Sequence, residues 1–151
     1  MFFKPTFKSE VKKEYIKPVW KNTTEIEDKV IKYLEGRKIS QATIRWSNLI
    51  SSGKEFISGK ESMTIQFNYW RKSELINVKY RDSEKHFKMF GGAELIFYNI
   101  DSIKCETIAI ITEGEIDCLS LIECGFKSVV SVPNGAGASL DFLENCIDDF
   151  A

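Results

Sequence analysis

Two short apolar runs, separated by the length of one helix, dominate the last third of the sequence. The first, residues 107–111, is continuous rather than alternating, which is typical of a strand covered on both faces in a parallel sheet. Residues 114–124 have the spacing of a helix that stops at Gly125, and residues 129–132 form the second apolar run. Parallel strands need a crossover connection, so this order predicts a strand–helix–strand unit.

Two short helices are predicted in the first part of the chain, before this unit. Thr24 and Glu27 form a capping box that predicts the start of a helix, and Gly36 predicts its end. Ser40 begins a second short helix, in which Arg45 is the single cation suited to contacting DNA. We therefore interpret the pair as a packing hairpin rather than a helix-turn-helix DNA reader.

Alternation of apolar and polar residues then predicts an antiparallel hairpin. Residues 63–69 and 76–80 alternate on either side of a turn at 71–74. A basic group lies on and just after the second strand: Lys79, Arg81, Lys85 and Lys88. Lysine supplies a point charge and arginine a planar fork for phosphate oxygens, although a solvated strand face would have the same composition.

Charge is divided unevenly along the chain. Residues 1–90 hold 19 Lys and Arg against 11 Asp and Glu, a net charge of +8, whereas residues 91–151 hold 2 against 11, a net charge of −9. This division predicts a surface for a polyanion beside a site for cations. Two solvated faces of opposite sign that attract each other remain an alternative.

Other features narrow the class of protein. No apolar run approaches the roughly 20 residues that span a bilayer, and the start lacks a secretory signal, so we expect no membrane contact. The four cysteines show no CxxC pairing and His86 is the single histidine, so no zinc site is expected. Unpaired cysteines fit core positions in a protein of the reducing cytoplasm.

Acidic residues gather where the first apolar run meets the following helix. Glu113 falls at the carboxyl edge of the predicted sheet, where open α/β sheets bind ligands, and Asp117 lies one helical turn later on the same side. Gly114 allows a sharp turn and leaves space beside the carboxylate. Mg²⁺ (or Mn²⁺) suits such a site, although acidic residues also favour helix N-termini through the helix dipole.

Residues 108–136 resemble the first motif of the Toprim fold, which is shared by bacterial-type primases, type IA and type II topoisomerases, some nucleases and recombination proteins. Residues 111–117 and 129–136 are most similar to phage primase–helicases and the related mitochondrial helicase. The resemblance implies that Glu113 acts in metal-dependent phosphoryl transfer, as metal ligand or general base. It implies a supporting role for Asp117 and makes Glu115 a weaker candidate.

The basic segment is similar to the subdomain that precedes Toprim in phage-type primases. In that family, cations at the matching positions contact the incoming nucleoside triphosphate and the template backbone. The resemblance therefore assigns nucleotide and template binding to Lys79, Arg81, Lys85 and Lys88.

The sequence also departs from the family pattern. No Asp-x-Asp follows the strand–helix–strand unit, and the adjacent Asp148 and Asp149 would point to opposite faces of a strand. An upstream zinc-binding template reader and a GxxxxGK[ST] helicase motif are both absent from the sequence. We therefore expect a fragment of a longer primase or primase–helicase, inactive alone and working with a helicase domain or partner.

The predicted fold is α+β. Residues 1–23 form a leader or linker, residues 24–100 a helical lead-in plus a basic antiparallel subdomain, and residues 101–151 the N-terminal part of a Toprim α/β domain. The predicted function of the parent is Mg-dependent synthesis of RNA primers on single-stranded DNA. The alternatives are a non-catalytic nucleic-acid-binding Toprim module and another Toprim enzyme, a nuclease or topoisomerase. Three tryptophans, of which we expect at least two to be buried, could stack bases: Trp20, Trp46 and Trp70.

Overall fold

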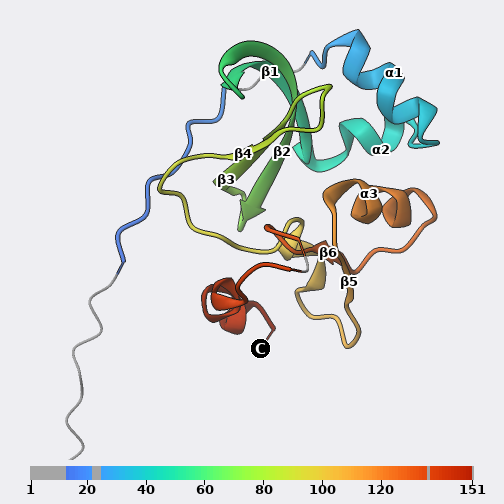
Figure 1. The fold of residues 1–151 in the computed structure, drawn as a ribbon. Coiled ribbons are helices and arrows are strands. Elements are labelled where there is room, and N and C mark those ends of the chain that lie inside the picture. The colour runs from blue at the N-terminus through green and yellow to red at the C-terminus, as the bar shows by residue number, and fades with distance from the viewer. Residues whose placement is uncertain (1–12, 22–24, 136, 151) are drawn as a thin grey trace, which may run out of the picture.

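The computed structural model describes residues 13–21, 25–135 and 137–150 (Figure 1). Thr24 of the predicted capping box lies outside these residues, as does most of the predicted leader. The predicted role of Glu27 in that box was wrong, because Glu27 is itself the N-cap residue of the helix and its side chain makes no capping hydrogen bond. Helix α1 (Asp28–Gly36) ends where Gly36 predicted and buries Val30, Ile31 and Leu34. Helix α2 (Gln41–Arg45) begins after Ser40, whose Oγ accepts a hydrogen bond from the backbone N–H of Thr43, and the 3-10 helix η1 (Trp46–Asn48) follows it.

A four-stranded antiparallel sheet forms the centre of the molecule. Its strands lie in chain order: β1 (Ile50–Ile57), β2 (Lys60–Arg71), β3 (Glu74–Arg81) and β4 (Phe87–Met89). The predicted hairpin is β2–β3, and its turn residues Lys72 and Ser73 both have positive φ, which matches the right-handed twist of the flanking strands. Strands β1 and β4 were not predicted.

The predicted strand–helix–strand unit consists of β5 (Ile110–Thr112), α3 (Glu115–Glu123) and β6 (Val129–Ser131), with β5 and β6 parallel. Full burial of the first strand was a wrong prediction, because Ile111 is 55% exposed and Ile108, just before the strand, is 76% exposed. The topology explains the difference. Strand β6 is flanked by β5 and by an antiparallel bridge to Tyr98, whereas β5 lies at the edge of this small sheet.

One hydrophobic core joins these elements. It takes side chains from α1, α2, one face of the large sheet, α3, β6 and two 3-10 helices, η2 (Ile100–Ile103) and η3 (Asp141–Phe150). Ser139 lies just before η3, and its Oγ accepts a hydrogen bond from the backbone N–H of Asp141 (3.2 Å). This core draws residues from both sides of the predicted boundary at residue 100, and the division into domains stays a prediction.

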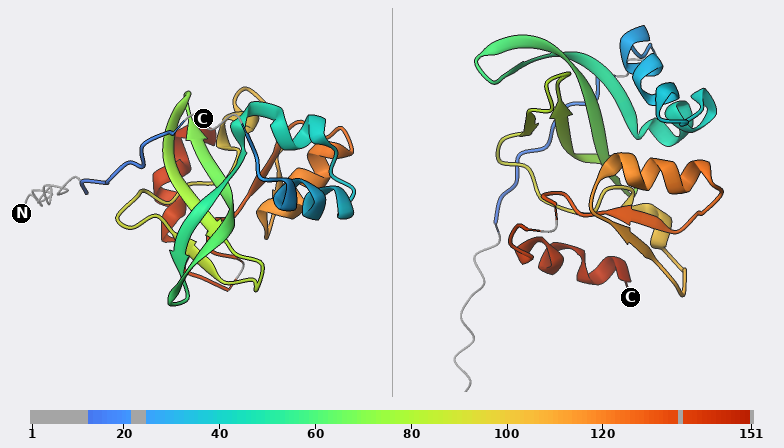
Figure 2. Two further views of the ribbon diagram at one scale, coloured as in Figure 1. Left: turned by 90° about the horizontal axis from the view of Figure 1, so that it is seen from above. Right: turned by 45° about the vertical axis from the view of Figure 1, so that its right-hand side comes forward.

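The opposite face of the large sheet carries a smaller cluster of Leu75, Val78 and Tyr80. Trp20 packs against it from the segment 13–21, which runs alongside the sheet in both views of Figure 2. A backbone hydrogen bond from Ile16 to Gly92 (2.9 Å) ties this segment to the loop after β4. Within its described part, the predicted leader therefore lies on the body of the protein.

Candidate functional site

Glu113 lies between the carboxyl end of β5 and the start of α3, as the sequence predicted, and its side chain is exposed. Asp117 is also exposed, in the first turn of α3. Gly114 has φ −138° and ψ 150°, an extended conformation open to any residue, so the turn itself does not require glycine. Its role is space, because a Cβ at this position would lie 3.2 Å from Asp117 Oδ2.

Glu115 faces inward instead. It is 3% exposed, and its Oε1 accepts hydrogen bonds from Lys79 Nζ (2.9 Å) and from the Tyr69 hydroxyl. Burial, together with the nearby charge of Glu115, raises the pKa of Tyr69 well above its usual value, so this phenol stays protonated and donates. Glu115 therefore belongs to a buried polar network that joins α3 to β2 and β3.

Lys79 is held by this network on two sides. Besides Glu115, its Nζ donates to the Pro133 carbonyl oxygen (2.9 Å), just after β6. Its side chain is 12% exposed, and the role in nucleotide and template binding that the resemblance implies for it stays a prediction. Lys79 thus joins the edge of the large sheet to the carboxyl end of the small one.

A hollow of about 410 Å³ lies where these parts meet. Three of the predicted site residues line it: Lys79, Lys88 and Glu113. Its remaining walls come from β4, from Gly114 and Glu115 at the start of α3, and from the Pro133–Gly135 turn after β6. The structure therefore places two of the predicted basic residues, Lys79 and Lys88, and the predicted catalytic carboxylate of Glu113 in the lining of one hollow.

Phe87 is a member of this site that the sequence did not predict. Its ring is 54% exposed at the mouth of the hollow, with Lys79 Nζ 5.2 Å from the ring centroid and the Arg81 guanidinium 5.8 Å from it. Cations this close to an aromatic face are attracted by the ring quadrupole. The available signal was an aromatic residue set among lysines and arginines, a pattern suited to holding a base beside its phosphates.

Arg81 lies behind Phe87 rather than in the hollow. It is 8% exposed, and its guanidinium stacks 5.0 Å from the centroid of the Tyr33 ring in α1. Arg81 lines a separate recess of about 370 Å³ together with Lys29 and Asp82. Its predicted role in nucleotide or template binding is not tested by this position.

The other two predicted cations differ from each other. Lys88 Nζ is 2.8 Å from Glu55 Oε1, and both side chains are partly exposed, so a phosphate could exchange with this carboxylate. Lys85 is exposed in the turn between β3 and β4, with φ 68°, and does not line the hollow. Of the four basic residues, Lys79 and Lys88 therefore line the hollow, whereas Arg81 and Lys85 do not.

The turn that carries Lys85 is organised by Asp82. Its carboxylate accepts hydrogen bonds from the backbone N–H groups of Glu84 and His86 (2.9 Å each) and lies 2.9 Å from His86 Nδ1. Burial alone would raise the pKa of Asp82, but the hydrogen bonds from His86 and Glu84 lower it below its usual value. The hydrogen bonds with Asp82 give His86 a structural role in this turn.

The acidic residues provide some, but not all, of the carboxylates of a divalent-cation site. Glu113 and Asp117 can supply two carboxylates, and Mg²⁺ commonly takes one or two while keeping several waters. Across the described ranges, no group of three His, Cys, Asp or Glu side chains converges as a metal site. Asp149 lies elsewhere, 3.0 Å from Arg71, which explains it as a structural residue. Cys118 and Cys146 are buried, as expected, whereas Cys105 and Cys124 are exposed.

Comparison with curated proteins supports the primase and primase–helicase family. The chain is 35% identical over 119 residues to the Twinkle homolog protein, chloroplastic/mitochondrial, of Arabidopsis thaliana. It is 33% identical over 117 residues to the Primase homolog protein of the same plant. Each similarity covers 78% of this chain, but only 16% and 33% of the respective relatives, so the chain spans a small part of their length. No family model and no solved structure matches the sequence.

Two expectations about location are affected. No helix in the described part of the chain is long and apolar enough to cross a membrane. The name of the Twinkle homolog places that relative in chloroplasts and mitochondria, so the predicted cytoplasmic location of this chain stays a prediction.

Proposed function

We propose that the protein carrying this chain is a DNA primase that synthesises RNA primers on single-stranded DNA from nucleoside triphosphates. The observation that carries the proposal is the 410 Å³ hollow, whose lining contains Lys79, Lys88 and the Phe87 ring together with Glu113. In the same proposal, β5, α3 and β6 are the first part of a Toprim domain, and a helicase domain or partner supplies the unwound template.

Each side chain has a defined task in this reaction. The Phe87 ring supports a base, and Lys88 exchanges Glu55 for a phosphate oxygen of the triphosphate. Lys79 keeps the hollow open by joining β3 to Glu115 and Pro133, and its charge contributes to the field that an anion meets. A 3′-hydroxyl then attacks the α-phosphate, a new phosphodiester bond forms, and pyrophosphate leaves.

Glu113 and Asp117 would hold a magnesium ion (or manganese) at the edge of this hollow. When bound, such an ion offsets the charge that develops on the phosphate oxygens. The exposure of both carboxylates and the space left by Gly114 support this role. We assign Glu115 a structural role instead, and its buried contacts with Lys79 and Tyr69 support this assignment.

The test is Glu113→Gln in the protein that carries this chain. Loss of one carboxylate that stabilises the transition state costs several kcal/mol, so primer synthesis should fall at least about 100-fold. Glu144→Gln, an exposed carboxylate in η3, is the matched control and should synthesise at the wild-type rate. Wild-type synthesis by Glu113→Gln would refute the assignment.

A non-catalytic binding module is the second candidate. It is favoured by the lack of a third converging carboxylate among the described residues. This alternative predicts binding of single-stranded DNA that weakens steeply with salt, with no primer synthesis by the wild type.

A further inference from the structure

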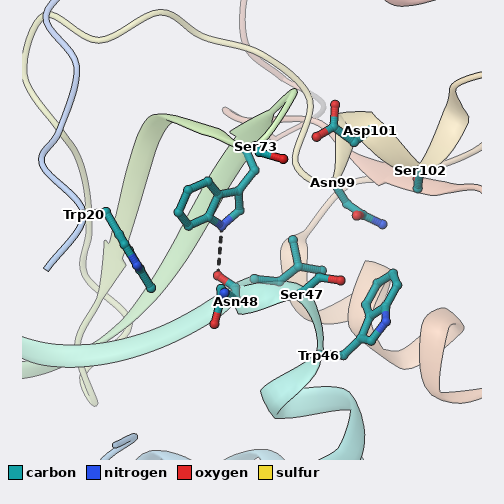
Figure 3. A pocket seen from close by; sticks show the side chains of 10 residues that line it. Trp20, Trp46, Ser47, Asn48, Ser73, Asn99, Asp101 and Ser102 are labelled. Atoms are coloured by element: carbon teal, nitrogen blue, oxygen red, sulfur yellow. Dashed lines mark hydrogen bonds between the residues drawn. The ribbon is translucent and has the colours of Figure 1, made fainter. Parts of the chain in front are cut away.

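All three tryptophans of the sequence line one groove of about 630 Å³ (Figure 3). We call it the tryptophan groove and define it by Trp20, Trp46, Trp70, Asn48 and Asp101. It shares no lining residue with the hollow at Glu113. Trp20 and Trp70 pack against the smaller hydrophobic cluster of the large sheet, as expected for at least two of the tryptophans. Trp46 is 45% exposed and belongs to neither hydrophobic cluster of the described residues, so packing does not explain its position in the groove.

The local backbone holds the indoles in place. Trp70 Nε1 donates a hydrogen bond to the Asn48 carbonyl oxygen (3.0 Å), and the Trp20 ring meets the Trp70 ring edge to face with centroids 5.0 Å apart. Ser47 and Asn48 both have positive φ, a conformation that non-glycine residues rarely adopt, directly after Trp46. Trp20 and Trp70 are half-buried, whereas Trp46 remains 45% exposed.

The lining of the groove favours a neutral, flat, polar ligand. Asp101 is its single charged lining residue, and one of its oxygens accepts a hydrogen bond from the backbone N–H of Lys72 (2.9 Å). In Figure 3, the polar side chains of Asn99 and Asp101 lie at the upper right of the groove, Trp46 lies at the lower right and Trp20 lies at the left. No lysine or arginine lines the groove, so its floor does not fit a phosphate.

Three cations are instead sequence neighbours of residues that line the groove. Arg45 precedes Trp46, Lys21 follows Trp20, and Lys72 precedes the lining residue Ser73. All three are exposed, and none takes part in an ion pair within the described part of the chain. A groove that is lined by aromatic residues and has exposed cations next to its lining residues in the chain is suited to single-stranded nucleic acid, whose bases stack while its phosphates meet positive charge.

We infer that the tryptophan groove stacks unpaired bases of single-stranded DNA. This inference deepens the proposed function, since the strand that it would hold is the template of primer synthesis. The groove would grip the template at a position separate from the hollow where nucleotides are joined. Stacking is tolerant of sequence because every base has a π-face, so the groove would hold the strand without reading it.

Intrinsic fluorescence gives a direct test, because every tryptophan of the chain lines the groove. Titration with an oligothymidylate of about 16 nucleotides, near the upper end of typical site sizes, should change the fluorescence until the groove is saturated. The free oligonucleotide concentration at half-saturation gives the dissociation constant. Trp46→Ala should weaken binding about five- to 20-fold, the lower part of the range for loss of one base stack, because Trp46 is half exposed. Trp46→Phe, which keeps a ring, should recover most of the affinity.

The control is Phe126→Ala, which removes a ring of similar exposure (49%) that does not line the groove, and it should bind like the wild type. In this chain, Glu113→Gln should also bind the oligonucleotide like the wild type, whereas in the protein that carries the chain it should lose primer synthesis, so the two proposals can fail separately. Equal affinity for Trp46→Ala and Phe126→Ala, or no fluorescence change in the wild type at saturation, would overturn the groove. Either result would leave the Glu113 experiment to decide the proposed function.

Discussion

The buried pair Lys79–Glu115 gives the sharpest prediction about this molecule. Their side chains are 12% and 4% exposed, so water can solvate very little of the Glu115 carboxylate. Lys79→Met removes the cation and leaves Glu115 buried with the Tyr69 hydroxyl. Breaking one partner of a buried ion pair typically costs about 3–5 kcal/mol, because the remaining charge keeps its desolvation penalty. We expect a loss of about 3 kcal/mol in the free energy of unfolding.

The double variant Lys79→Met/Glu115→Gln should cost less than the sum of the two single variants. Once both charges are gone, no uncompensated ion remains in the core. The expected coupling energy is at least about 2 kcal/mol, within the range for residues in one network. Urea denaturation at neutral pH, followed by tryptophan fluorescence, measures all three variants against the wild type.

Lys88→Met is the matched control. Lys88 lies equally close to its partner Glu55 (2.8 Å), but these side chains are 42% and 28% exposed. Exposed pairs contribute about 0–1 kcal/mol, so this variant should stay within about 1 kcal/mol of the wild type. Additive effects of Lys79→Met and Glu115→Gln would show that the pair does not exist in solution, and the account of the hollow built on it would fail.

Two further predictions concern the core. Burial raises the pKa of Cys118 from 9.0 to about 12, so unfolding releases a proton above pH 9 and stability falls as pH rises towards 12. Between pH 8 and pH 10 the wild type should lose about 1.4 kcal/mol more than Cys118→Ala in urea denaturation, and equal losses would contradict this. Arg71 lies 3.0 Å from both Glu94 and Asp149, so Arg71→Met should cost about 2 kcal/mol. Asp148→Asn, at an exposed position, should change thermal stability by less than about 0.5 kcal/mol, and equal effects of the two variants would contradict the structural role of Arg71.

The sequence predicted elements whose pattern is local. The β2–β3 hairpin followed from alternation over many residues, and the β5–α3–β6 unit from two apolar runs and the glycine after the helix. Strand β1 was missed because its residues 50–57 mix serine, glycine and charged side chains. All eight of these residues nevertheless pair with β2. The extended conformation of β1 therefore depends on its pairing with β2 and not on the intrinsic strand propensity of its residues. Strand β4 has three residues and exists through its pairing with β3.

The candidate site was predictable to a similar extent. The position of Glu113 followed from the rule that ligands bind at the carboxyl edge of parallel strands. The inward turn of Glu115 did not, because its partners Tyr69 and Lys79 come from distant strands that helical spacing does not describe. Phe87 was missed for the same reason, since its place at the hollow depends on how the antiparallel sheet meets the small one.

The uneven charge of the chain acquires a physical meaning from these pairs. Lys79 pairs with Glu115, and Arg71 pairs with Glu94 and Asp149, so each of these shielded contacts joins a cation from residues 1–90 to a carboxylate from residues 91–151. Part of the opposite charge therefore holds the two halves together, which is the alternative left open by composition. That attraction does not use up the remaining charge, because Glu113 stays exposed at the hollow where the halves meet and Asp117 is exposed in the first turn of α3. A site that binds and releases a cation and a polyanion has to keep its shape and also keep some carboxylates free. In the proposed function, the shielded pairs between the halves meet the first need and the exposed carboxylates meet the second.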